Sequence, residues 1–131
     1  MQDLPKPADL VSLVADFLRA EIMPATKGAQ NFQLRVAINA LDLAARQVRD
    51  EGAGDVAEQA RLVTLLGRDG DLEELNRALC ETIASGAMTL ETPGVADHLW
   101  RTTMAKLAVD QPNYASYRRE KDRGTLAASL P

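Results

Sequence analysis

The chain has 131 residues, of which 46% are hydrophobic, 26% charged and 4% aromatic, and its formal net charge is −4. These values are typical of one soluble globular domain, and the acidic balance argues against nucleic acid as a partner, because duplex binding needs a basic surface. The single Cys80 excludes an internal disulfide, and without a signal-like start or an apolar run near ~18 residues we expect a cytoplasmic protein that does not enter a membrane.

Apolar residues recur at helical spacing along the chain and predict five helices. These helices cover about residues 6–22, 30–50 and 55–66, then from 71 up to Gly86 and from 93 up to Pro112. Ala and Leu are abundant, whereas aromatic residues, which favour strands, are rare. We therefore predict an all-α fold, an up-and-down bundle of five helices joined by short connections.

Local signals support the predicted helix ends. Asp71 and Glu74 have the spacing of a capping box. Thr92 is the expected cap of the helix that begins at Pro93. In the first helix the apolar face consists of Leu10, Val11, Val14, Phe17, Leu18 and Ile22.

The second helix, with the sequence "FQLRVAINALDLAARQVR", is apolar almost all the way round. It is interrupted by a narrow polar line made of Arg35, Asn39, Asp42, Arg46 and Arg49. On an ideal helix this polar line is about 80° wide, whereas a surface helix usually gives a much wider arc to water. We therefore predict that helix 30–50 is the centre of the bundle, enclosed by the other helices except along this line.

The polar line has two interpretations. In the first it faces solvent, and Asp42 pairs with Arg46 one turn away, which contributes little to stability. In the second it lines a groove or an interface, where the guanidinium groups of Arg35 and Arg46 bind a carboxylate or phosphate while Asn39 and Asp42 orient a ligand or partner. The line has no histidine and no nucleophile, so the second interpretation describes a binding surface and not a catalytic one.

Other reactive residues are expected to be structural. His98 is the only histidine, and a catalytic role would need a nucleophile and an orienting carboxylate within reach. Cys80 is expected to be a buried, inert thiol. The segment "GRDGDLEE" lacks the ligand spacing of a calcium loop and predicts a turn followed by a helix cap. No metal-binding, nucleotide-binding or other cofactor motif is found in the sequence, and we expect no cofactor.

The segment after Pro112 is predicted to be an irregular tail. We divide the chain into a helical domain over 1–112 and a tail over 113–131, which is docked to about 123 and disordered beyond. Tyr114 and Tyr117 precede a basic stretch. They either pin the tail to the bundle or to a second subunit, as tyrosine does at interfaces, or belong to a solvated terminus.

Four runs of the sequence resemble a bacterial family of small all-helical proteins of unknown function. The runs are "LVADFLRAEIMP", "NFQLRVAINALDLAAR", "LNRALCETIASG" and "LAVDQPNY", with "RVAINAL" the most specific element. The resemblance implies that the gene lies beside an aminoglycoside-phosphotransferase-like kinase, often with acyl-CoA dehydrogenases nearby. It carries no catalytic residue over to this chain, because the family has no established activity.

Three functions remain open from the sequence. The first is a non-catalytic accessory or interaction subunit of such a kinase, which docks through the polar line or through the tail. The second is a bundle that binds a small anionic molecule at Arg35 and Arg46. The third is an enzyme, which would need Asp42 or His98 as a general base. A homodimer is compatible with each of these functions, because exposed apolar residues would form its interface. Packing in the core explains the presence of such residues equally well.

Overall fold

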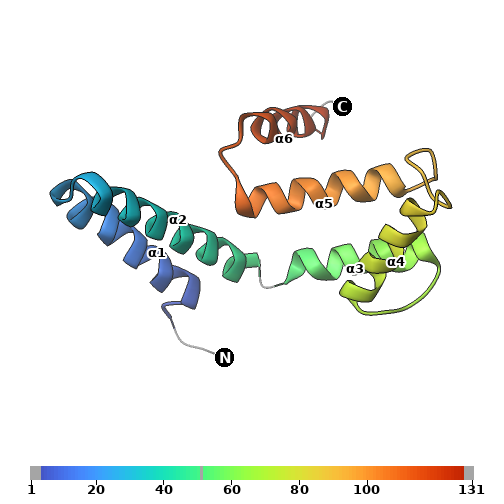
Figure 1. The fold of residues 1–131 in the computed structure, drawn as a ribbon, viewed down its shortest axis with the longest axis horizontal. Coiled ribbons are helices and arrows are strands. Elements are labelled where there is room, and N and C mark those ends of the chain that lie inside the picture. The colour runs from blue at the N-terminus through green and yellow to red at the C-terminus, as the bar shows by residue number, and fades with distance from the viewer. Residues whose placement is uncertain (1–3, 51, 129–131) are drawn as a thin grey trace. The chain divides into compact units, whose positions relative to one another are not determined.

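The structure is a computed structural model that describes residues 4–50 and 52–128 (Figure 1). Within these residues all regular secondary structure is helical, which confirms the all-α prediction. The chain divides into two compact units, Met1–Gly52 and Ala53–Pro131. No helix in the described residues has the length and apolar character needed to cross a bilayer.

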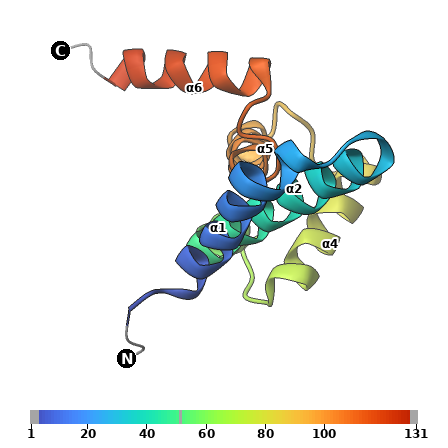
Figure 2. The same cartoon turned by 90° about the vertical axis from the view of Figure 1, so that its left-hand side faces the viewer.

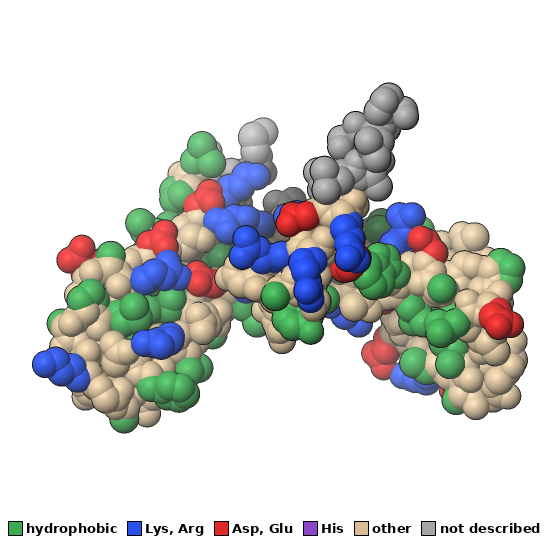
Figure 3. All heavy atoms as spheres, turned by 90° about the horizontal axis from the view of Figure 1, so that it is seen from above, with side chains coloured by type: hydrophobic (Ala, Val, Ile, Leu, Met, Phe, Trp, Pro, Cys, Tyr) green, Lys and Arg blue, Asp and Glu red, His purple; other side chains and the backbone are tan. Residues whose placement is uncertain are grey.

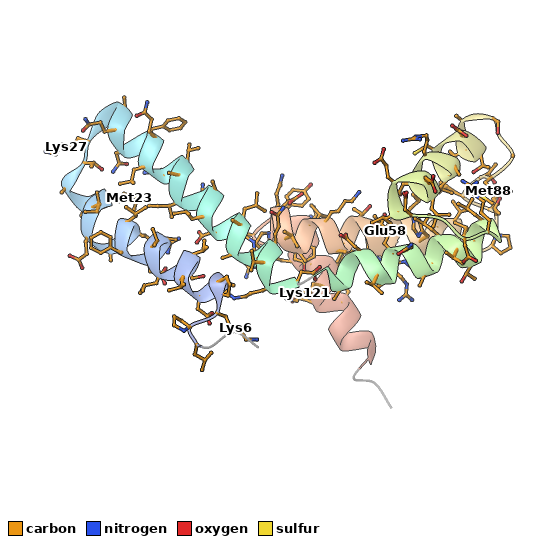
Figure 4. The ribbon with its side chains drawn as sticks, turned by 90° about the horizontal axis from the view of Figure 1, so that it is seen from below. Lys6, Met23, Lys27, Glu58, Met88 and Lys121 are labelled. Carbon is orange, nitrogen blue, oxygen red and sulfur yellow. The ribbon has the colours of Figure 1, made fainter. Side chains whose placement is uncertain are left out.

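The first unit is a hairpin of two helices. Helix α1 (Pro7–Phe17) continues into one wide π-helical stretch (Leu18–Ile22) and a short 3₁₀ turn (Met23–Ala25), and α2 (Gly28–Asp50) returns along it. Figures 1 and 2 both show α1 and α2 side by side and running in opposite directions. Met23 and Lys27 mark the turn in Figure 4.

Small residues bring the two helices of the hairpin together. Ala8 and Ala15 of α1 and Ala45 of α2 are buried, with Ile38 as the only larger buried side chain in the described part of this unit. Alanine allows two helix axes to approach closely because its side chain ends at Cβ. The larger apolar residues of both helices consequently lie beside this contact, or point away from it.

The predicted central position of helix 30–50 is wrong. Within its unit α2 packs against α1 and the two short segments that follow α1, while Phe32, Val36 and Val48 are exposed. The sequence of α2 places apolar residues on both sides of the polar line. One neighbouring helix covers only one of those sides. The five-helix bundle built around this helix is corrected accordingly.

The second unit contains α3 (Ala53–Leu66), α4 (Leu72–Ala84), α5 (Val95–Asp110) and α6 (Ala115–Ala128). Helix α3 packs against α4 and α5, and α5 contacts α6. Leu62, Leu75 and Leu79 form the core, and Met88, on the loop after α4, packs against them (Figure 4). Unlike the hairpin, this unit buries whole leucine side chains.

Two details of α4 test the sequence interpretation. The carboxylate of Asp71 accepts a hydrogen bond from the backbone N–H of Glu74 at 2.8 Å, which confirms the predicted cap. Cys80 is exposed, so the prediction of a buried thiol is wrong. Cys80 follows the core residue Leu79, and one residue further along an α-helix turns the side chain by about 100°, away from the core.

The predicted irregular tail is also wrong, because residues 115–128 form α6. The described residues therefore contain six α-helices and not five. The segment "YRREKDR" consists mainly of strong helix formers, and Arg123 pairs with Glu120 one turn away. The segment has no apolar periodicity, which is the signal on which the predicted helices depend. The domain limits at 112 and 113 and the disorder beyond 123 stay predictions, and residues 129–131 lie outside the described residues.

Candidate functional site

The polar line of α2 lies along the edge where α2 meets the segment containing α1. Near the turn, the amide of Asn31 donates to the backbone oxygen of Met23 at 3.0 Å. Further along α2, Asp42 accepts a hydrogen bond from Arg19 at 2.7 Å. At the far end the guanidinium of Arg49 donates to the hydroxyl of Ser12 at 2.9 Å. Two members of the line, Asp42 and Arg49, therefore stabilise the hairpin together with Asn31, one turn before Arg35.

Arg19 connects the two helices most strongly. Its guanidinium donates to Asp42 and, at 2.6 Å, to Asp16 on its own segment. The hydrogen bond to Asp42, followed by the negative charge of that residue, raises the pKa of Arg19 above its usual value. Asp42 thus pairs across the hairpin, and Arg19 holds the carboxylate of Asp42 in place. Because Asp42 already accepts a hydrogen bond from Arg19, its position favours a structural role in the hairpin.

The central residues of the polar line differ in exposure. Arg35 and Asn39 are exposed and Arg46 is partly buried. Arg35 donates to Asn31 one turn earlier at 3.2 Å. A cavity of about 340 Å³ in this unit lies between the start of α1 and the end of α2, where Arg49 is the member of the polar line that lines it.

A group of four exposed apolar side chains on α1 was not recognised as a site from the sequence. We call it the α1 stripe. Its four side chains and their exposed fractions are Leu10 48%, Leu13 66%, Val14 49% and Phe17 54%. Their spacing of i, i+3, i+4 and i+7 places them on one face of α1. The spacing was present in the sequence, but the face assigned there omitted Leu13 and included Val11 and Leu18, which are partly buried.

A second exposed apolar pair lies on α2 beside the polar line. Phe32 and Val36 are 68% and 53% exposed, and Arg35 and Asn39 follow each of them by three residues. Residues three apart on a helix are surface neighbours. Hydrophobic side chains therefore reach the surface of this unit next to polar ones, and Figure 3 shows such mixed patches over the face in view.

The remaining predicted residues lie in the second unit. Tyr114 is half exposed just before α6, whereas Tyr117 on α6 is buried. His98 on α5 is only 3% exposed. In the described residues no cluster of three or more His, Cys, Asp or Glu side chains could hold a metal ion.

The sequence of the chain matches the model of a known protein family. The family model described as "Domain of unknown function (DUF6285)" matches residues 24–114, more than half of the chain. The chain belongs to the DUF6285 family. No curated protein and no solved structure matches it.

The DUF6285 match divides the surfaces described above. It contains α2 to α5 completely, and with them the polar line and the pair Phe32 and Val36. It begins at Pro24, so the α1 stripe precedes it, and it ends at Tyr114. Three of the four runs that suggested the resemblance lie inside the match, and the run "LVADFLRAEIMP" lies before it except for its last residue.

Proposed function

We propose that the protein is a non-catalytic interaction subunit that docks on a protein partner through its first unit. The observation that carries this proposal is the α1 stripe, in which four large apolar side chains are about half exposed or more at i, i+3, i+4 and i+7. An amphipathic helix uses anchors at this spacing when it enters an apolar groove of a partner. The family itself assigns no activity.

The polar side chains of α1 favour a protein over a membrane as the partner. A helix that lies on an anionic lipid surface carries mainly Lys and Arg on its polar face. The polar positions of α1 and the following turn hold Asp9, Asp16 and Arg19, and Arg19 is already paired with Asp16 and Asp42. These side chains offer no excess of positive charge to lipid headgroups.

The partner class comes from the sequence resemblance, which points to an aminoglycoside-phosphotransferase-like kinase. Phe32 and Val36 extend the apolar surface onto α2, and Arg35 and Asn39 supply polar groups at its edge. Interfaces commonly combine an apolar centre with a polar rim in which arginine is enriched. Of the predicted site residues, Arg35 and Asn39 therefore act as rim contacts, whereas Asp42 holds the hairpin together.

The alternative function places an anionic small molecule at Arg35 and Arg46. It has weaker support, because Arg35 is exposed and donates to Asn31 on its own helix. The cavity found in this unit lies nearer Arg49, at the other end of the polar line. At the exposed Arg35, water and Asn31 compete with such a ligand for the guanidinium group.

Co-expression of the full chain with a kinase of this class from the same genome tests the proposal. The wild-type protein should co-elute with the kinase at a stoichiometric ratio in size-exclusion chromatography. Leu13→Arg places a charge in the α1 stripe and should abolish co-elution. Leu90→Arg is the matched control, because Leu90 is 69% exposed and lies in a loop of the second unit, and it should leave the complex intact.

Each other outcome changes the assignment. A complex that forms equally well with Leu13→Arg overturns docking through the α1 stripe. The absence of any complex with the wild-type chain overturns the kinase as partner. A homodimer that Leu13→Arg converts to monomers assigns the stripe to a second copy. Loss of the complex in Phe32→Arg as well would extend the surface to α2, inside the family match.

A further inference from the structure

A pocket in the second unit lies between α3 and the beginning of α5. Its volume is about 440 Å³, within the range of small-molecule sites. Its polar side chains come from Arg61 and Thr64 on α3 and from Asp97 and His98 on α5, and its apolar wall includes Leu65 and Pro93. We call it the α3–α5 pocket. It lies entirely inside the family match and in a different unit from the proposed docking surface.

The first turn of α5 opens onto this pocket without a side-chain cap. The cap position is Gly94, with φ 90°, and Thr92, the predicted cap, instead accepts a hydrogen bond from the backbone N–H of Thr89. The N–H of Val95 bonds to Thr92 and that of His98 to Gly94. The amides of Ala96 and Asp97 lie between them in the first turn, where a helix has no internal acceptors.

Two buried side-chain nitrogens of the pocket lining point to a missing partner. His98 is 3% exposed, and its Nδ1 has no hydrogen-bond partner in the described residues. Nε of Arg61 is likewise buried without a partner, and the terminal nitrogen of Arg61 makes one long contact of 3.4 Å to Thr102. Buried polar groups are nearly always paired with protein, water or a ligand.

The charges around the pocket limit the ligand to a single negative charge. Arg61 is the one cationic side chain in the lining. Asp97 is also in the lining, but both of its oxygens accept hydrogen bonds from Arg101 at 2.8 and 2.9 Å. Burial, followed by the positive charge of Arg61, lowers the pKa of His98, so its imidazole is a neutral partner. A dianion such as phosphate would bring a second negative charge with no second cation to meet it.

We propose that the α3–α5 pocket binds a small monocarboxylic acid, whose carboxylate lies at the first turn of α5 beside Arg61 and His98 and whose apolar part packs on Leu65 and Pro93. A helix N-terminus and a guanidinium both favour an anion, and together they supply N–H donors to two carboxylate oxygens. The apolar wall of the pocket accounts for the rest of the molecule. This inference does not depend on the interaction function of the first unit.

Titration of ¹⁵N-labelled full chain with butyrate tests the proposal by NMR. Saturable shifts are expected for the amides of Ala96 and Asp97 and for the imidazole of His98. Butyramide, which has the same shape without the charge, should not produce them, and inorganic phosphate should not displace butyrate. The Arg61→Met variant should bind butyrate about tenfold more weakly, since a charge-assisted contact is lost.

Arg77→Met is the matched control, because Arg77 is exposed on α4 and pairs with Glu73 one turn away; its affinity for butyrate should equal that of the wild type. The wild-type shifts keep the test valid even if Arg61→Met fails to fold. Equal shifts with butyramide, displacement by phosphate, or shifts that do not saturate or that avoid the first turn of α5 would each overturn the proposal.

Discussion

The two units of the molecule bury different kinds of side chain. In its described residues the hairpin of α1 and α2 buries three alanines and Ile38, and several of its large apolar side chains are exposed. The second unit buries Leu62, Leu75, Leu79 and Val95. Because burial of each methylene contributes about 0.8 kcal/mol, the second unit gains far more from its own interior. The hairpin therefore leaves apolar surface available to a partner, whereas the second unit is stabilised mainly by its own core.

Leu75→Ala should produce the largest loss of stability. The side chain of Leu75 is completely buried beside Leu62 and Leu79, and such truncations cost about 2–5 kcal/mol because a cavity remains. Urea denaturation followed by circular dichroism measures the change. A loss below about 1 kcal/mol would contradict the assignment of the main core to these leucines.

Gly94→Ala should destabilise the second unit by about 1–2 kcal/mol, because an L-residue at φ 90° is strained. An added Cβ would also lie 3.3 Å from Cδ1 of Leu65. Gly124→Ala is the control, because Gly124 lies in α6 with open space around the added methyl group, and it should stabilise slightly. Equal effects of the two variants on the urea midpoint would show that the start of α5 tolerates a side chain.

His98 should make the second unit sensitive to mild acid. Burial, followed by the positive charges of Arg61 and, to a smaller extent, Lys106, lowers its pKa below 6.5, while Glu58 and Asp97 partly oppose the shift. The unfolded chain therefore takes up a proton first, and this contribution to stability is present above pH 6.5 and is lost as the pH falls below it. Because His98 is the only histidine, its imidazole resonance can be titrated without ambiguity. A midpoint at or above 6.5 would contradict the burial of its ring.

Leu13→Ala should have the smallest effect, within about 0.5 kcal/mol, because the side chain is mostly exposed in the isolated chain. Urea denaturation of this variant beside Leu75→Ala compares the same substitution in the two units. A loss near that of Leu75→Ala would mean that the α1 stripe is already covered in the free protein, and the contrast between the two units would then fail.

The sequence predicted what depends on local chemistry. The abundance of Ala and Leu predicted helices, and the Asp71 cap of α4 was identified from its spacing with Glu74. The position of α2 was not predictable in this way, because a helical wheel shows which sides are apolar but not how many of them a neighbour covers. Helix α6 was missed because its central run of charged residues has no apolar periodicity, and the contacts of Asp42 with Arg19 were missed because they join residues far apart in the chain.

In the candidate sites, too, local sequence predicted the features of a single helix but not the contacts between distant residues. The polar line lies on α2, but its members Asp42 and Arg49 bind across the hairpin, whereas the sequence suggested solvent or a groove or interface for a ligand or partner. The α3–α5 pocket requires Arg61 and His98 to meet from two helices, and no spacing within one helix indicates such a meeting. The predicted roles of Tyr114 and Tyr117 stay predictions.

The π-helical stretch at Leu18–Ile22 contains one extra residue, and this residue determines which face of α1 points outward. A π turn holds about one residue more than an α turn, which is equivalent to an insertion that is absorbed without breaking the helix. Removal of one residue, for example Ala20, would restore an even spiral and rotate the preceding segment by about 100° relative to the turn at Pro24. A relative that lacks the extra residue would present a different set of side chains outward from the same overall hairpin.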